Sequence, residues 1–210
     1  AGSDIPSIRV MINDFRVLAL FAFNFNFGLG MGSVMTFIAI FMTDSLLASA
    51  TLVGVVVGSR AVVSSVFQPL FGRLADRVPR HRMVAVGAMF LAVTTSAIPL
   101  APSVWILLLM FLVLGLAESA MLPASLAITT DLGRTYGFGT LIGLTNAILV
   151  FGLLVGSVGS ALIEAEAGMS NMFLAVAVFM ALMIVLFLAM WGKGTRQAAG
   201  PSATNQSPVQ

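Results

Sequence analysis

The sequence predicts an all-α integral membrane protein, a bundle of six transmembrane helices with both termini on the cytoplasmic side. The composition is the first reason: 59% of the residues are hydrophobic and only 9% are charged, and the mean hydropathy is +1.07, far from the mixture found in a soluble globular domain. Six apolar stretches are each long enough to cross ~30 Å of hydrocarbon, which takes about 20 helical residues. Nine of the ten basic residues lie outside these stretches, and only Arg60 lies within one.

The transmembrane bundle is expected to cover residues 17–191. Lipid-facing strands would alternate apolar and polar residues in segments of about ten, whereas these stretches are continuous, which favours helices. The residues before the bundle, 1–16, are interpreted as a cytoplasmic lead or the end of a linker between two halves. The tail, 192–210, is rich in Gly, Ser, Ala, Pro and Gln without an apolar period, which predicts a disordered cytoplasmic segment. The six expected spans are 17–43, 46–71, 83–101, 104–130, 138–163 and 172–191.

The distribution of charge fixes the expected orientation. The loop 72–82, GRLADRVPRHR, carries four arginines between the second and third spans, and arginines that flank a span normally stay in the cytoplasm. With that loop inside, the opposite side receives only acidic residues, namely Asp44, Glu164 and Glu166. This split supports six spans with both ends inside. The basic residues on the inner side are Arg9, Arg16, Arg73, Arg77, Arg80, Arg82, Arg134, Lys193 and Arg196.

The sequence gives little support for other classes of protein. The isoelectric point is near 9.9, but the net charge is only +2 and the basic residues flank spans, so topology explains them better than nucleic-acid binding. The chain has no cysteine, and its one histidine, His81, cannot build a metal site alone. We find no H-E-x-x-H zinc motif and no phosphate-binding loop. We therefore expect no enzyme activity, no metal, no cofactor and no nucleic-acid partner.

The loop 72–82 resembles the signature of the major facilitator superfamily, roughly G-x-L-a-D-R-x-G-R-[RK]-[RK], which follows the second helix of each six-helix half. The positions that match are Gly72, Leu74, Asp76, Arg77, Arg80 and Arg82, whereas Pro79 replaces a glycine and His81 a basic residue. The place of the loop after the second of six spans also fits.

The resemblance implies that this chain corresponds to one half of a twelve-span carrier, with the site for a small-molecule substrate between the halves. The polar lead, the long tail and the fifth span resemble the C-terminal half more closely. An N-terminal half and a naturally half-sized protein are the alternatives. The resemblance implies a cytoplasmic gate at Gly72, Asp76, Arg77, Arg80 and Arg82, which closes the inner side through Asp76 and Arg77 in particular; anchoring of topology alone is the other interpretation of these arginines.

Arg60 and Glu118 are the candidates for a substrate or proton site. Arg60 lies twelve residues before Gly72, about 18 Å along a helix that rises 1.5 Å per residue, and Glu118 is the only carboxylate expected at comparable depth. Ionisable residues within a membrane usually have a partner, so we expect the two to pair across the second and fourth spans. A fixed structural ion pair and a functional pair remain open. Pro123 follows Glu118 and predicts a bend in the fourth span.

Polar and small residues within the spans supply further candidates. Asn24 and Asn26 in the first span, and Asn146 in the fifth, are added to the candidate substrate or proton site. Asn26, Gly30 and Ser33 share one helix face, which suits either a cavity lining or close helix packing. The residues expected to pack helices are Gly54, Gly58, Gly152, Gly156 and Gly159.

The glycines of the fifth span partly resemble an antiporter signature, G-x-x-x-G-P-x-x-G-G, but Ser157 and Ser160 replace its proline and last glycine, so antiport is not inferred. We expect a secondary transporter of a small solute in a prokaryotic plasma membrane, working by alternating access, with proton-coupled export as a further expectation. Its partners would be membrane lipid and the other six-helix half or a second copy. The alternative is a six-helix channel or assembly subunit that forms homo-oligomers.

Overall fold

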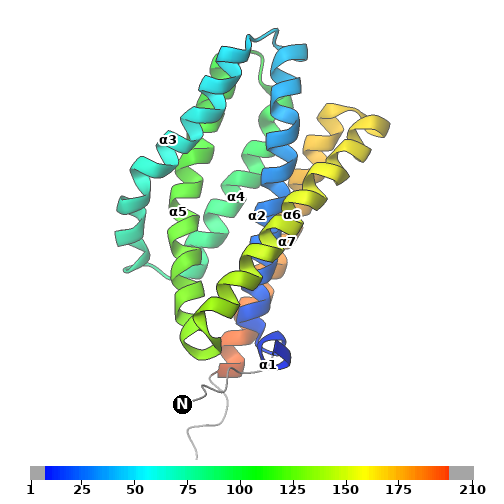
Figure 1. The fold of residues 1–210 in the computed structure, drawn as a ribbon. Coiled ribbons are helices and arrows are strands. Elements are labelled where there is room, and N and C mark those ends of the chain that lie inside the picture. Colours follow the sequence, from blue (N-terminus) through cyan, green and yellow to red (C-terminus); the bar gives the residue numbers. More distant parts are fainter. Residues whose placement is uncertain (1–7, 199–210) are drawn as a thin grey trace, which may run out of the picture.

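The computed structural model describes residues 8–198 and is helical over nearly all of them (Figure 1). Six helices are long and apolar enough to span a membrane, so the predicted six-helix bundle is confirmed. A short helix precedes them, and a π-helical turn, Phe41–Ser45, and a 3₁₀ turn, Ile98–Leu100, extend two of them. The helices are α1 (Ile8–Ile12), α2 (Phe15–Ile40), α3 (Ala50–Ala75), α4 (Arg80–Ala97), α5 (Val104–Tyr136), α6 (Phe138–Ala167) and α7 (Met169–Ala198).

Local sequence signals set several helix boundaries. The Asp14 side chain caps α2 by accepting a hydrogen bond from the backbone N–H of Arg16 at 2.8 Å, and Ser49 caps α3 through the N–H of Leu52. Side chains of this kind satisfy N–H groups that have no partner within the helix. Gly137 separates α5 from α6 with φ at 90°, a conformation that favours glycine.

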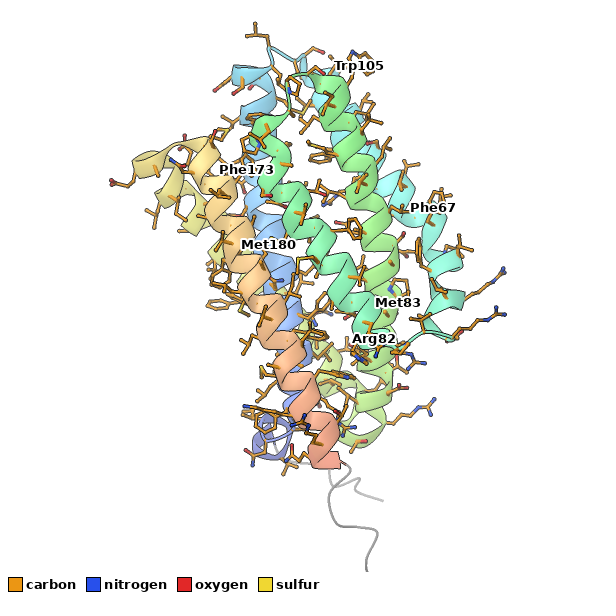
Figure 2. The ribbon with its side chains drawn as sticks, turned by 180° about the vertical axis from the view of Figure 1, so that it is seen from behind. Phe67, Arg82, Met83, Trp105, Phe173 and Met180 are labelled. Carbon is orange, nitrogen blue, oxygen red and sulfur yellow. The ribbon has the colours of Figure 1, made fainter. Side chains whose placement is uncertain are left out.

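The connections alternate between the two ends of the bundle. The α3–α4 and α5–α6 turns lie at the same end as α1 and the last turns of α7, at the bottom of Figure 1. We call this the inner end because it carries the basic residues. Figure 2 shows Arg82 toward this end and Trp105 at the opposite, outer end. Trp105 is 68% exposed, as expected of an aromatic residue at a membrane–water interface.

The helices pack in a pattern that repeats once within the chain. α2 packs on α6 and α7, while α5 packs on α3 and α4, and α4 also packs on α7. Exchanging α2 with α5, α3 with α6 and α4 with α7 reproduces this set of neighbours. Because α2 runs toward the outer end and α5 toward the inner end, the two three-helix units form an inverted repeat of the kind found in many transporters.

The termini and the basic loop differ from expectation. The tail predicted from residue 192 is helical through Ala198, because Gly194 packs against Phe15 and Arg16 at the start of α2. The lead contains α1 and the first two residues of α2. α3 and α4 extend into the predicted loop, which leaves four residues, 76–79, outside helices. The predictions for residues 1–7 and 199–210 lie outside the described residues.

Candidate functional site

Arg60 on α3 and Glu118 on α5 form an ion pair in the interior of the bundle. Their Nη1 and Oε1 atoms lie 2.9 Å apart, and the residues are 7% and 4% exposed. The sequence predicted this pairing. The contact is not aligned as a hydrogen bond, because Oε1 accepts none, whereas Arg60 Nη1 donates to the Met31 sulfur at 3.0 Å. The negative charge of Glu118 is therefore balanced by the nearby positive charge of Arg60 and not by a hydrogen bond to Oε1.

The surroundings of the pair are apolar. A small cavity beside it is lined by α2, α3, α4 and α5, and its volume of about 10 Å³ is close to that of a single water. Arg60 Nε lies in this interior without a hydrogen-bond partner. A buried charge that lacks some of its partners is costly. Both charged groups thus lack some of their hydrogen-bond partners. The cavity beside them has room for a water but not for a larger solute. The apolar lining is Phe27, Gly30, Met31, Val34, Leu91 and Leu114.

A close helix crossing positions the pair. A Cβ added to Gly115 of α5 would lie 2.5 Å from the Arg60 carbonyl oxygen and 3.0 Å from Val63 Cβ, so the α5 backbone at Gly115 lies directly against the α3 backbone at Arg60. Glu118 lies one turn beyond Gly115 and thereby reaches Arg60. Pro123 lies inside α5 and Pro69 inside α3, where each removes a backbone hydrogen bond and favours a bend.

A second polar cluster occupies the inner end of α5. Arg80 at the start of α4 pairs with Asp131 and lies 4.0 Å from Asp76. The predicted gate therefore connects α3, α4 and α5 through Arg80. Arg77 and Arg82 are exposed, and Gly72 has open space where a Cβ would point.

A third cluster ties α2 to the end of α5. The Tyr136 hydroxyl donates to Asp14 Oδ2 at 2.9 Å, and Arg16 Nη2 donates to the same oxygen at 3.0 Å. Burial acts to raise the pKa of the Asp14 carboxyl, but hydrogen bonds from Arg16 and Tyr136 together hold its pKa below the ordinary value. The carboxylate is thus stabilised in its charged form.

The polar candidates of α2 differ in their hydrogen-bond partners. Asn26 is buried and donates to the Met180 carbonyl on α7 at 3.4 Å, where Figure 2 shows Met180 beside α2. Ser33 donates to the Gly156 carbonyl on α6 at 3.2 Å, and Gly30 lies against the Met180 side chain. Asn24 donates to Leu20 of its own helix. Of these residues, Gly30 also lines the small cavity beside Arg60 and Glu118.

The glycines that were expected to pack helices together fall into two groups. Gly152 and Gly156 of α6 lie against the backbones of Phe25 and Leu29 of α2, so a Cβ would collide there. The packing expected of Gly54, Gly58 and Gly159 does not occur among residues 8–198, because a Cβ on any of them would meet open space there.

Asn146 also differs from expectation. Its side chain is exposed on α6, away from Arg60 and Glu118 in the interior, and its place in a substrate site stays a prediction. The open glycines of α3 and α6 face away from the bundle interior. Asn146 on α6 does so as well.

Sequence reasoning missed four residues that complete these clusters: Met31, Asp14, Asp131 and Tyr136. Asp131 falls one residue beyond the predicted end of the fourth span, beside a basic loop, and that position was an available signal. Asp14 precedes an apolar stretch in the manner of a helix cap. The contacts of Met31 and Tyr136 depend on which helices are neighbours, so the linear sequence gives no signal for them.

The family comparison agrees with this architecture. A profile described as Major Facilitator Superfamily matches residues 20–209, nearly the whole chain. The chain belongs to the Major Facilitator Superfamily. The resemblance drawn from the loop 72–82 is thereby confirmed, and membership agrees with the expectation that the chain is not an enzyme.

Two bacterial relatives match this superfamily member over part of their length. It is 32% identical over 126 residues to "Multi-drug resistance efflux pump PmrA homolog" of Lactococcus lactis subsp. lactis (strain IL1403), which covers 60% of this chain and 31% of the relative. It is 25% identical over 147 residues to "Multidrug resistance protein 1" of Bacillus subtilis (strain 168), which covers 69% of this chain and 38% of the relative. The matched part is thus less than half of each relative. The chain is a multi-pass membrane protein, and the expected prokaryotic plasma membrane agrees with these bacterial relatives.

Proposed function

We propose that this chain forms one half of a secondary active transporter that exports small solutes by alternating access, with protons as the coupling ion. The observation that carries the proposal is the buried Arg60–Glu118 pair inside a bundle of the Major Facilitator Superfamily. Ionisable groups at such depth mark substrate or proton pathways in many membrane proteins. The names of the two relatives, both multidrug resistance proteins, support export and a range of solutes rather than one.

Glu118 is the proton carrier in this proposal. Protonation removes its charge and releases Arg60, which otherwise would stay buried without an opposite charge. The freed guanidinium then has to find another partner, and this changes the balance between packing arrangements of α3 and α5. Uptake of a proton at Glu118 would thereby be linked to rearrangement at the Gly115 crossing.

A second six-helix unit, either the other half or another copy, would complete the substrate cavity. α3 and α6 bury the smallest shares of their residues among the six spans. Their open glycines, Gly54 and Gly58 on α3 and Gly139 and Gly143 on α6, would let another helix approach closely. The inverted repeat makes α3 and α6 equivalent, so both are suited to the same kind of contact.

The cluster of Asp76, Arg80 and Asp131 would act as the inner gate. It joins the ends of three helices through charges that lie near water, where such contacts are weak enough to break and re-form. Breaking it would free the inner segments of α3 and α5 to move with the second unit.

The open glycines also favour a second candidate, a channel or assembly subunit made of copies of this chain. The two functions predict different transport behaviour. A carrier accumulates solute against its own gradient when a proton gradient is imposed, whereas a channel only equilibrates it.

The test is transport in inside-out vesicles that contain the complete protein with its second unit. A panel of fluorescent lipophilic dyes is added outside while the vesicle lumen is made acidic. We expect several dyes to accumulate and a protonophore to abolish the accumulation. Failure of every dye to accumulate, or equal accumulation in vesicles without the protein, would contradict the proposal.

A further inference from the structure

The polarity of α3 changes at Arg60. The helix runs from the outer to the inner end (Figure 1). Val56 and Leu52 precede Arg60 by four and eight residues, toward the outer end, and both are apolar. Ser64 and Gln68 follow it by the same two intervals, toward the inner end. Because neighbours along a helix face recur every four residues, Arg60 has apolar neighbours on its outer side and polar ones on its inner side.

α5 shows the same change at Glu118. On the outer side of the carboxylate, Phe111 and Leu114 share its helix face and are fully buried. On the inner side, Ser125 and Thr129 share that face and are also buried. The Thr129 hydroxyl donates to the Ser125 backbone carbonyl of its own helix at 2.9 Å. On both helices, the face that carries the ion pair is thus apolar outward and polar inward.

Ser64 and Gln68 lead from the pair toward open space. Gln68 Nε2 donates to Ser64 Oγ at 3.4 Å. Ser64 is buried, whereas Gln68 is partly exposed and lines a groove of about 360 Å³ between the inner parts of α3 and α5. Gln68 is eight residues from Arg60, about 12 Å along the helix. The two polar side chains therefore lie between the buried pair and a space that can hold several waters.

Two prolines add backbone acceptors on this side of the pair. Pro69 in α3 and Pro123 in α5 lack the N–H that would bond the carbonyl four residues earlier. The two carbonyls belong to Ser65 and Ser119, each directly after a polar residue named above. Ordered water is one of the means by which freed carbonyls are satisfied within transmembrane helices. Both proline rings line the groove, so these acceptors favour water beside it.

The surroundings of Glu118 offer a proton no other titratable group. Besides Glu118, Arg60 is the one charged side chain among the described residues that line the small cavity at the pair, and a guanidinium stays protonated. A proton that leaves Glu118 therefore has to pass to water. The other lining residues, from α2, α4 and α5, are Phe27, Gly30, Met31, Val34, Leu91 and Leu114.

We propose that Glu118 releases its proton toward the inner end through waters held by Ser64 and Gln68, which makes these two residues positioning residues of the proton path. The inference rests on the proposed function, in which Glu118 is the proton carrier. The carboxyl gives its proton to a water beside Ser64 Oγ and becomes the carboxylate that pairs with Arg60. The proton then passes along waters to the groove at Gln68.

The position of Gln68 links this path to alternating access. Gln68 follows Gly54 by fourteen residues, close to four helical turns, so it lies beside the α3 face that the second unit covers in the proposed carrier. Separation of the two units on the inner side opens the path to water, and their contact closes it. Release of the proton is thereby confined to the state that is open to the inner side.

The test follows protonation of Glu118 by time-resolved infrared spectroscopy on inside-out vesicles that contain the complete protein. In these vesicles the inner end faces the medium. A light pulse frees protons from a caged compound in the medium, and the carboxyl band that Glu118→Gln lacks reports their arrival, since a path that releases protons also admits them. We expect Ser64→Ala and Gln68→Leu each to slow the rise of this band about fivefold, the factor expected when one hydrogen bond to a water is lost.

Two matched variants separate the path from general effects on the helix. Ser64→Thr keeps the hydroxyl and should keep the rate. Ser59→Ala removes a hydroxyl on the outer side of Arg60, where it donates to the Val56 carbonyl, and should leave the rate unchanged. The final amplitude of the band should stay the same in all four variants, whereas a change in the carboxyl itself would alter it. Melting followed by circular dichroism establishes that each variant is folded.

The path and the proposed carrier function can fail separately. A Glu118 band that rises equally fast in Ser64→Ala, Gln68→Leu and the unaltered protein would overturn the path and leave Glu118 as the proton carrier. Equal slowing by Ser59→Ala would also overturn it. Lack of any band that Glu118→Gln removes would overturn both the path and the coupling by Glu118. Slower protonation in the two path variants, with no dye accumulation by the unaltered protein, would support the path and contradict only the proposed export.

Discussion

Arg60 and Glu118 lie 2.9 Å apart in the bundle interior, yet the facing carboxylate oxygen accepts no hydrogen bond. The pair joins two parallel helices, α3 and α5, at the point where they cross most closely. Its strength therefore affects both the stability of the bundle and the angle between the helices. A tightly bidentate pair would make this contact rigid, whereas in the proposed carrier the observed pair responds to one proton on Glu118.

The first prediction concerns stability of the pair. Arg60→Gln or Glu118→Gln alone should each lower the free energy of unfolding by about 3 to 5 kcal/mol, because one charge stays buried without its partner. The double variant should recover most of this loss. Thermal melting by circular dichroism in detergent measures the difference, and double-variant stability no higher than that of the single variants would contradict the expectation. Full transport by the neutral double variant would leave the pair with a structural role only.

The second prediction concerns the α2–α6 contact. Gly156→Ala should lower the melting temperature, because its Cβ meets the Leu29 backbone and overpacking typically costs about 1 to 3 kcal/mol. Gly159→Ala is the matched control: it lies one turn away in the same helix, its Cβ meets open space, and removing a helical glycine is neutral to favourable. Equal melting temperatures for the two variants would show that the close approach is unimportant.

The third prediction concerns pH and Asp14. Because its folded pKa is lowered from 3.8, the stability that Asp14 contributes is present above that value and is lost as pH falls through the lower folded pKa. Asp14→Asn removes this contribution. Between pH about 5 and pH about 3, the melting temperature of Asp14→Asn should fall less than that of the unaltered protein.

Tyr136→Phe is the companion variant, since it removes one hydrogen bond that lowers the Asp14 pKa. It should give an intermediate dependence on pH. Identical falls in melting temperature for all three proteins would rule out Asp14 as the titrating group.

Sequence patterns predicted the number of helices and the Arg60–Glu118 pair for a clear physical reason. Hydrocarbon penalises charge strongly. The lengths of the apolar stretches therefore predict the number of helices, and the two isolated charges within them predict that Arg60 and Glu118 pair. The same penalty does not act on glycine, so Gly156 and Gly159 look equivalent in sequence although only Gly156 meets another helix. The exposure of Asn146 could not be predicted for a similar reason, because an amide can face either a neighbouring helix or the outside. The helix at 192–198 depends on Gly194 meeting Arg16, a contact between the two ends of the described chain that composition does not record.

The fourth prediction concerns the inner gate. Asp131→Asn should change stability by about 1 kcal/mol or less, because the pair with Arg80 is half-exposed, but it should reduce dye accumulation. The charge-reversed double variant Arg80→Asp with Asp131→Arg should restore accumulation. Asp76→Asn removes the longer contact with Arg80 in the same cluster and should give a smaller loss of accumulation. Unchanged accumulation in Asp131→Asn would remove this pair from the gate.

The most direct test of the central claim compares two transport modes in Glu118→Gln, using vesicles that contain the complete protein. Exchange of labelled for unlabelled dye requires only alternating access, whereas accumulation driven by a pH gradient also requires a group that takes up and releases the proton. The account predicts that Glu118→Gln retains exchange and loses gradient-driven accumulation. Retention of both by Glu118→Gln would contradict the assignment of Glu118 as the proton carrier.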